Sequence, residues 1–243
     1  MPIGVIVNAL SILIGGIAGT IAGNTLTDGF KKKINMILGC CSMGMGISAI
    51  ILMENMPAVV FSIIIGTTIG LVIRLGDRIN TAAVEMNKIV EKIVKTPKPG
   101  ISHEEFTATL VTCIVLFCAS GTGIYGAIVS GMMGDHSILI AKSVLDIFSA
   151  AIFACTLGAV VSIVSIPQLI IFLILFFCAE LIIPMTNKTM IADFKACGGF
   201  IMLATGFRMI NVKMFPVADM IPSMVIVMPI SAFWVSYIVP LVS

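Results

Sequence analysis

Charged side chains are scarce in this chain. They make up 11% of the 243 residues, whereas an ordinary soluble domain carries about 25%. A water-soluble globule of this length could not cover its core with so few ions, so the composition excludes that class. The formal net charge of +2 gives no indication of nucleic acid as a partner, and we expect none.

Catalytic and metal-binding motifs are missing from the sequence as well. The two histidines, His103 and His136, are isolated, and no HExxH, nucleophile-elbow or phosphate-loop motif occurs. The seven cysteines lie within or beside apolar runs without a CxxC pair, so we interpret them as small apolar residues. The sequence predicts no enzyme activity, no metal site and no cofactor.

Long apolar runs are what the chain has in abundance. Hydrophobic residues make up 59% of it, and apolar runs of about 20 residues recur from end to end, each able to cross a bilayer as a helix. The sequence predicts an all-α polytopic membrane protein with a single transmembrane domain over residues 1–243. We expect eight spans, or seven if two in the middle are one: 3–23, 34–53, 57–75, 106–132, 137–164, 167–185, 194–211 and 217–240.

Basic residues predict how the first half of the chain is oriented. Lys31, Lys32 and Lys33 follow the first span, and six further basic residues between Arg74 and Lys98 follow the third. Basic loops stay in the cytoplasm, so both clusters lie there if the N-terminus is outside. The second half lacks this asymmetry, which leaves the side of the C-terminus open.

One long polar segment, residues 77–105, connects the third and fourth spans. Its apolar residues follow helical spacing from Ile79 to Val94, opposite a charged face, until Pro97 interrupts the pattern. We predict an amphipathic helix in the cytoplasmic membrane interface. It would act as a connector or, alternatively, as a regulatory or partner-binding segment.

Two stretches of the sequence resemble each other. "GCCSMGMGI" from Gly39 and "GFIMLATGF" from Gly199 both place a glycine, six residues, a second glycine and an apolar residue. With the predicted spans, the two copies would face opposite ways across the membrane. Inverted repeats of this kind are common in transporters, although two glycines are also compatible with chance.

An intramembrane ion pair carries most of the functional interpretation. Lys142 and Asp146 are one helical turn apart within an apolar run, and Ser143 and Ser149 extend the same face. An isolated charge at mid-bilayer costs at least about 2.5–3.5 kcal/mol, so these residues are expected to face the inside of the bundle. They either line a route for a solute or proton, or form a structural pair that fixes the helix register.

The preceding span is rich in glycine and small polar residues. We expect it to be broken near Ser120, Gly121, Thr122, Gly123 and Tyr125, because glycine weakens a helix by about 1 kcal/mol relative to alanine. Unwound backbone at membrane depth can serve as a ligand for a substrate. The alternative is that the small residues only allow close helix packing.

Two further polar residues lie within predicted spans. Asn8, on an early turn of the first span, could contribute an amide to a cavity or could be satisfied by a neighbouring helix. Glu180 lies near the end of its span, where reaching the membrane surface competes with a role in the pathway.

Several stretches together resemble a known family. They are "MPIGVIVNA", the glycine-laced first span, "SGTGIYGAIVSGMMGDHSILIAKSVLDIFSA" and "ADFKACGGFIMLATGFRMI". The chain resembles the family called domain of unknown function 554, with YqgA-like and YdfK-like members, over nearly its whole length. The most specific part is the glycine-rich span followed by the run from Asp135 to Asp146. The resemblance implies a multi-pass protein of the bacterial cytoplasmic membrane, and it implies no substrate.

These observations favour a transporter or channel for a small solute or ion. Asp146 would exchange a proton or bind a cation, Lys142 would be its counter-ion, and backbone at Gly121 to Gly123 would contact the substrate. The alternative is a membrane scaffold or sensor that transports nothing and holds a purely structural ion pair. The expected partners are the lipid bilayer and a small solute or ion, with a homo-oligomer left open.

Overall fold

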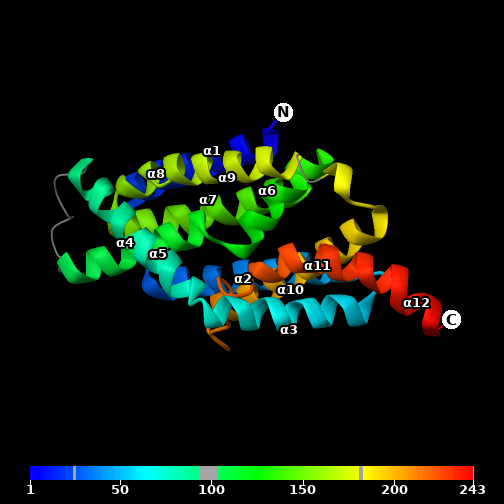
Figure 1. Ribbon diagram of the computed structural model, residues 1–243. Coiled ribbons are helices and arrows are strands. Elements are labelled where there is room, and N and C mark those ends of the chain that lie inside the picture. The colour runs from blue at the N-terminus through cyan, green and yellow to red at the C-terminus, as the bar shows by residue number, and fades with distance from the viewer. Residues whose placement is uncertain (24–25, 94–102, 181–182, 243) are drawn as a thin grey trace. The chain divides into compact units, whose positions relative to one another are not determined.

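The structure, a computed structural model, describes residues 1–23, 26–93, 103–180 and 183–242 (Figure 1). These residues form helices and turns and no strand. In chain order the helices are α1 (Ile3–Ala22), α2 (Asp28–Ile50), α3 (Met56–Val72), α4 (Leu75–Ile93), α5 (His103–Cys118), α6 (Gly121–Met133), α7 (Ser137–Leu157), α8 (Val160–Ile163), α9 (Ser165–Glu180), η2 (Ile183–Met185), α10 (Lys188–Met209), α11 (Pro222–Phe233), η3 (Trp234–Ile238) and α12 (Val239–Val242).

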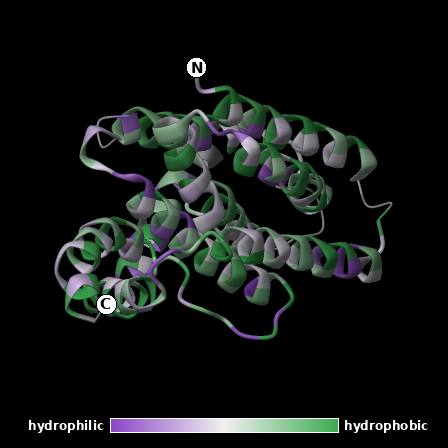
Figure 2. Cartoon of the chain, turned by 90° about the vertical axis from the view of Figure 1, so that its right-hand side faces the viewer, coloured by the Kyte–Doolittle hydropathy of each residue, from purple (hydrophilic) through white to green (hydrophobic). Residues whose placement is uncertain are grey.

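The helices of the described segments agree with a membrane-spanning chain. Seven of them are long and apolar enough to cross a bilayer, or eight if the bent pair of α3 and the first part of α4 is one span. Large apolar side chains stay more than half exposed on them, among them Ile14, Ile64 and Ile174. Figure 2 shows this apolar character along most of the helices. A helix that is apolar on its outer face needs lipid rather than water around it.

The predicted fifth and sixth spans have different boundaries in the structure. The predicted span 137–164 ends at Leu157, because the chain turns at Gly158 with a φ of 78° that favours glycine. The short helix α8 and helix α9 together form the next candidate span, from Val160 to Glu180. The predicted start of this span at residue 167 was therefore seven residues too late. The rest of its predicted range includes residues 181–182, which lie outside the described residues.

The predicted fourth span is interrupted. Helix α5 ends at Cys118, and α6 begins at Gly121 with Ser120 as its N-cap. The Ser120 hydroxyl accepts a hydrogen bond of 3.1 Å from the backbone N–H of Gly123. The break thus lies just before the glycines, and Gly121 to Gly123 are buried helical residues rather than the unwound backbone that the sequence suggested.

The helices group into two compact units. Unit 1 comprises residues 1–36 and 77–180, and unit 2 comprises residues 37–76 and 181–243. Unit 1 contains α1 and α5 to α9 with most of α4, and unit 2 contains α3, α10 and α11 with most of α2.

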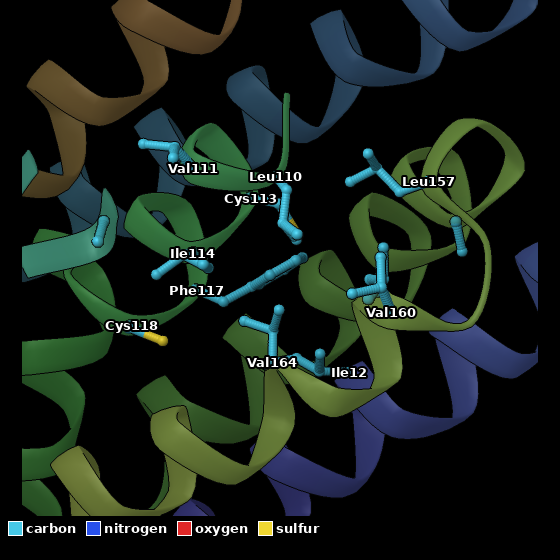
Figure 3. Packing of buried hydrophobic residues seen from close by; sticks show 14 of the residues in the cluster. Ile12, Leu110, Val111, Cys113, Ile114, Phe117, Cys118, Leu157, Val160 and Val164 are labelled. Carbon is cyan, nitrogen blue, oxygen red and sulfur yellow. The ribbon is translucent and has the colours of Figure 1, made fainter. Parts of the chain in front are cut away.

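In unit 1, helices α1 and α7 pack at very short distance. A Cβ atom placed on Gly15 would lie 2.3 Å from the carbonyl oxygen of Ile147, and one on Gly19 would lie 2.1 Å from that of Ala151. Only glycine fits at such contacts, as in other small-residue interfaces of membrane helices. Beside them, Ile12, Phe117 and Val164 belong to an apolar cluster formed by α1, α5, α7 and the α8–α9 segment (Figure 3).

Helix α4 contains the described part of the predicted amphipathic connector. Ala83 is buried in the apolar cluster of unit 1, and Val84 and Met86 pack against that cluster. The apolar face of this helix therefore contacts the protein's own core at these positions. Residues 94–102 of the predicted connector lie outside the described residues.

In unit 2, the two similar stretches of sequence pack against each other. A Cβ atom on Gly46 would lie 2.6 Å from the carbonyl oxygen of Gly199, and one on Gly206 would lie 2.7 Å from that of Gly39. The earlier glycine of α2 thus faces the later glycine of α10, and the reverse, so the helices run antiparallel. The shared spacing brings two antiparallel helix backbones into contact.

Candidate functional site

The ion pair of α7 is buried at the middle of its helix. Asp146 lies about 13.5 Å along the helix axis from Ser137, at 1.5 Å per residue. Lys142 forms an ion pair with Asp146, and the residues are 3% and 5% exposed. The earlier end of α7 at Leu157 makes Asp146 more central than the predicted span allowed. Lys142 therefore points toward the interior and does not extend to the membrane surface.

Helix α1 supplies an amide to this pair. The Asn8 Nδ2 atom donates a hydrogen bond of 2.8 Å to Asp146 Oδ2 and is 3.4 Å from Ser143 Oγ. Asn8 is fully buried. The close packing of α1 on α7 at Gly15 and Gly19 explains how so short a side chain reaches the carboxylate.

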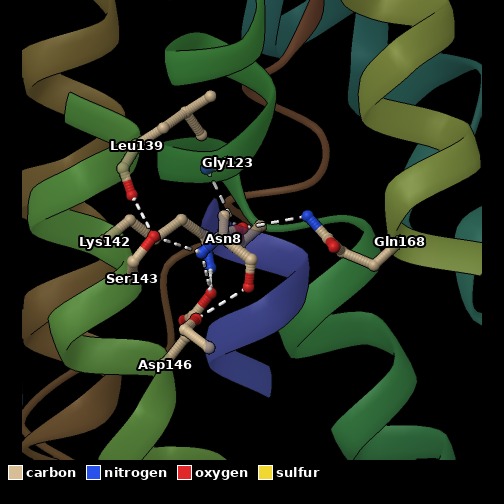
Figure 4. A network of polar contacts seen from close by, with 9 residues as sticks. Asn8, Gly123, Leu139, Lys142, Ser143, Asp146 and Gln168 are labelled. Carbon is tan, nitrogen blue, oxygen red and sulfur yellow. Dashed lines mark hydrogen bonds and ion pairs between the residues drawn. The ribbon is translucent and has the colours of Figure 1, made fainter. Parts of the chain in front are cut away.

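Helix α9 supplies a further member that the sequence did not indicate. Gln168 is fully buried and donates a hydrogen bond of 2.9 Å from Nε2 to Asn8 Oδ1 (Figure 4). The predicted span began at residue 167, which placed Gln168 at the membrane edge. A polar amide within the run "SIPQLIIFLILFF" was the available signal. Asn8, Lys142, Ser143, Asp146 and Gln168 are called the unit 1 polar network from here on.

The first turn of α6 lies beside this network. A Cβ atom on Gly123 would be 2.2 Å from Cζ of Phe172, which follows Gln168 by one turn of α9. Figure 4 shows Gly123 close to the network. The Lys142 ammonium group lies 5.9 Å from the centre of the Phe117 ring of α5, within the range of a cation–π contact. The ion pair of α7 thus contacts α1 and α5, and it is connected to α9 through Asn8.

The other predicted pathway residues are divided by the structure. Thr122, Tyr125 and Ser149 are buried in unit 1. Glu180 is exposed at the C-terminal end of α9, about 18 Å along the helix from Gln168. Glu180 is thus not part of the network, because it lies twelve positions after Gln168 on the same helix.

Unit 2 contains a second buried carboxylate. Asp193 of α10 is fully buried, and its Oδ1 atom accepts hydrogen bonds from the backbone N–H groups of Glu54 at 3.0 Å and Asn55 at 2.8 Å. Its Oδ2 atom accepts from Asn55 Nδ2 at 3.0 Å and from Ser231 Oγ at 2.6 Å. All four donors are uncharged.

Asp193 was missed because the predicted seventh span began one residue after it. In the structure α10 begins at Lys188, and the Asn187 side chain accepts a hydrogen bond of 2.8 Å from the backbone N–H of Met190. Asparagine is a favoured N-cap residue, so Asn187 was the signal that could have moved the helix start upstream. Within the described segments, no group of three or more His, Cys, Asp or Glu residues could hold a metal ion.

Comparison with known proteins covers nearly the whole chain. Residues 3–232 match a family described as "Protein of unknown function (DUF554)". The chain is 45% identical over 237 residues to "Uncharacterized protein YqgA" of Escherichia coli (strain K12), covering 98% of this chain and 99% of that protein. It is 23% identical over 223 residues to "Uncharacterized membrane protein YdfK" of Bacillus subtilis (strain 168), covering 92% and 93%. No solved structure matches the chain.

Proposed function

This chain belongs to the DUF554 family and is an integral membrane protein, and on that premise we propose that it is a transporter or channel for a small solute or ion. The substrate would pass the unit 1 polar network. One observation carries the proposal: an ion pair near the middle of α7 binds the Asn8 amide of α1, which in turn accepts a hydrogen bond from the Gln168 amide of α9. Placing a charged side chain at such a depth costs about 2.5–3.5 kcal/mol. Helix packing alone does not need a charge there, so the pair is expected to have a function.

The state described here would be an occluded one. Lys142 and Asp146 are 3% and 5% exposed, so a substrate must reach them through a change in helix packing. Helical hydrogen bonding is already interrupted between α5 and α6 at Ser120, so a change there would break few backbone hydrogen bonds. The glycines and small residues of this break would let the first turn of α6 move against Phe172.

Each residue has a defined role in the proposal. Asp146 holds the polar end of the substrate or exchanges a proton, and Lys142 balances its charge. Asn8 fixes the orientation of the carboxylate, and the first turn of α6, from Gly121 to Gly123, forms one wall of the route. Catalysis is not part of this proposal.

The double substitution Lys142→Met with Asp146→Leu tests the proposal. Removing both charges together leaves no buried charge uncompensated, and such replacements are often neutral for stability or even stabilising. In liposomes containing the purified full chain, we expect the double variant to lose flux of the ions and solutes that the wild type moves. Unchanged flux would remove the pair from the mechanism.

A matched control separates loss of flux from loss of fold. Ile140→Leu changes a lipid-facing residue of the same helix, 46% exposed, and should leave flux unaltered. Size-exclusion chromatography and helical circular dichroism should be the same for the wild type, the control and the double variant. A wild-type chain that moves no tested solute would contradict transport itself.

A second candidate function is a membrane scaffold or sensor. The observation in its favour is that Asp146 receives both the Lys142 ammonium and the Asn8 amide, so the pair is satisfied within the protein. In that case the double variant would keep every cellular function of the wild type. The charged face of α4, with its exposed Glu85–Lys88 pair, would then be the surface for a partner.

The proposal includes a location and an orientation. The named relatives come from bacteria, which supports the cytoplasmic membrane of a bacterium, and the basic clusters support an external N-terminus. In a cysteine-free background, a membrane-impermeant maleimide should label Met133→Cys in intact spheroplasts and should not label Lys32→Cys. The reverse pattern would invert the topology.

A further inference from the structure

The unit 1 polar network has a direction. An ionised carboxylate can only accept hydrogen bonds, so the Asp146 contact at 2.8 Å must come from Nδ2 of Asn8. This leaves Oδ1 of Asn8 facing α9, where it accepts from Nε2 of Gln168. The Asp146 carboxylate therefore fixes the orientation of the Asn8 amide, and the Asn8 amide fixes that of the Gln168 amide.

The last acceptor in this series of hydrogen bonds, Gln168 Oε1, has no partner among the described residues. Gln168 Oε1 is buried and makes no hydrogen bond within the described part of the chain, and Gln168 as a whole is fully buried. Turning the amide round would place Oε1 against Asn8 Oδ1, acceptor against acceptor, and would leave Nε2 unpaired instead. A buried acceptor without a donor is unfavourable, so this position favours an N–H or O–H group that the described residues do not supply, from a bound ligand or a water molecule.

Charge balance limits what that group can belong to. The Lys142 ammonium and the Asp146 carboxylate cancel, so the network is neutral as a whole. An added cation would leave one uncompensated charge in a medium where charges are poorly screened. Selective sites for alkali ions also surround the ion with several oxygen atoms, whereas Gln168 Oε1 is the one buried oxygen of the five network side chains that the described residues leave unpaired.

We propose that Gln168 Oε1 is the recognition group of this site, and that its ligand is a small uncharged solute that donates N–H or O–H hydrogen bonds. The inference rests on the proposed transport function and narrows it from any small solute or ion to this class. The acceptor recognises the donor, while the neutral ion pair fixes the acceptor's orientation through Asn8.

Flux measurements with named probes test this inference. The full chain in liposomes is given glycerol or urea, with vesicle swelling followed by stopped-flow light scattering, and in parallel Na⁺, K⁺ and H⁺ with entrapped fluorescent indicators. We expect glycerol or urea to enter faster than in protein-free liposomes. Gln168→Met keeps the side-chain length but removes the acceptor, and should lower that flux about tenfold or more.

A second substitution at the same position separates recognition from folding. In acidic buffer, a protonated glutamic acid in Gln168→Glu would donate its hydroxyl to Asn8 and keep a carbonyl oxygen in place of Oε1. This variant should retain most of the wild-type flux measured at the same pH. The lipid-facing control Ile170→Met, 53% exposed on α9, should match the wild type.

The outcomes distinguish this inference from the transport proposal. Flux of ions without flux of glycerol or urea would overturn the inference and leave transport standing. Absence of any flux through the wild type would overturn both. Equal glycerol or urea flux through Gln168→Met and the wild type would show that Oε1 does not recognise the solute, as expected if a structural water satisfies it.

Discussion

Two buried carboxylates, Asp146 in unit 1 and Asp193 in unit 2, are accommodated in different ways. Asp146 receives an ammonium group and an amide from side chains of its own helix and of α1. Asp193 receives four uncharged donors, two of which are backbone N–H groups at the start of α3. Asp146 is thus stabilised by a counter-ion, and Asp193 by uncharged hydrogen-bond donors.

The difference indicates different roles for the two carboxylates. Asp193 occupies the N-terminus of α3, where the helix dipole favours a negative group and the Asn55 side chain does not cap its own helix. Its donors belong to the fold, so Asp193 joins α10 to α3 and α11. Asp146 is instead held by two side chains, the Lys142 ammonium and the Asn8 amide, in a network that ends on an unpaired acceptor. In the proposed transport function, a substrate would bind at this network.

The largest effect on stability is expected from Asp146→Asn. This substitution leaves the Lys142 ammonium buried without a counter-charge, which should lower the free energy of unfolding by about 3–5 kcal/mol. SDS titration of the protein in mixed micelles, followed by circular dichroism, measures it. The double variant Lys142→Met with Asp146→Leu is the control, and it should lie much closer to the wild type. Equal losses in the single and double variants would show that charge imbalance is not the cause.

Asp193→Asn should lower the free energy of unfolding by less, about 2–3 kcal/mol, measured by the same SDS titration. No buried cation is left behind, because the donors to Asp193 are uncharged. The loss comes from one amide NH₂ group that would face donors such as Asn55 Nδ2 or Ser231 Oγ. A loss as large as that of Asp146→Asn would show that the two carboxylates depend equally on their charge.

Ser231→Ala should lower the free energy of unfolding by about 1.5 kcal/mol. It removes one of the four donors to Asp193, at 2.6 Å, and leaves the other three in place. The matched control is Ser48→Ala on α2, whose exposed hydroxyl bonds only to its own helix. The two variants should differ in the SDS midpoint, and identical midpoints would argue against a stabilising role of the Ser231 contact.

Ser143→Ala should have the smallest effect, below about 0.5 kcal/mol. The Ser143 hydroxyl donates to the carbonyl of Leu139 in its own helix, and its contact with Asn8 is long at 3.4 Å. Asn8 keeps its shorter bond to Asp146 when the hydroxyl is removed. A decrease in the free energy of unfolding as large as that of Ser231→Ala would show that the Ser143 hydroxyl stabilises the Asn8–Asp146 contact.

Part of the site could be predicted from the sequence. Lys142, Asp146 and Asn8 stand out as polar groups in apolar runs, and their cost in lipid indicates that they face protein. Gln168 and Asp193 carry the same signal but lie at the edges of predicted spans. Hydropathy places helix ends poorly, whereas the glycine turn at Gly158 and the N-cap at Asn187 mark the starts of the segments that contain them.

The partners of these residues could not be predicted. Asn8 is 138 residues from Asp146 and 160 from Gln168 along the chain, and no local pattern connects them. The similar glycine spacings at Gly39 and Gly199 suggested a relation between two segments. The spacing alone did not predict that these two segments pack on each other.

Three features of this protein follow from its amino-acid sequence alone: it lies in a lipid bilayer, it is helical, and it has opposite charges within an apolar span. Hydropathy, helical periodicity and one-turn spacing are local properties of a chain, so they can be read without a structure. The packing of the helices sets which carboxylate contacts a cation and which accepts hydrogen bonds from backbone N–H groups. That choice depends on which helices approach at their glycines, and contacts between segments more than 100 residues apart arise only when the chain packs.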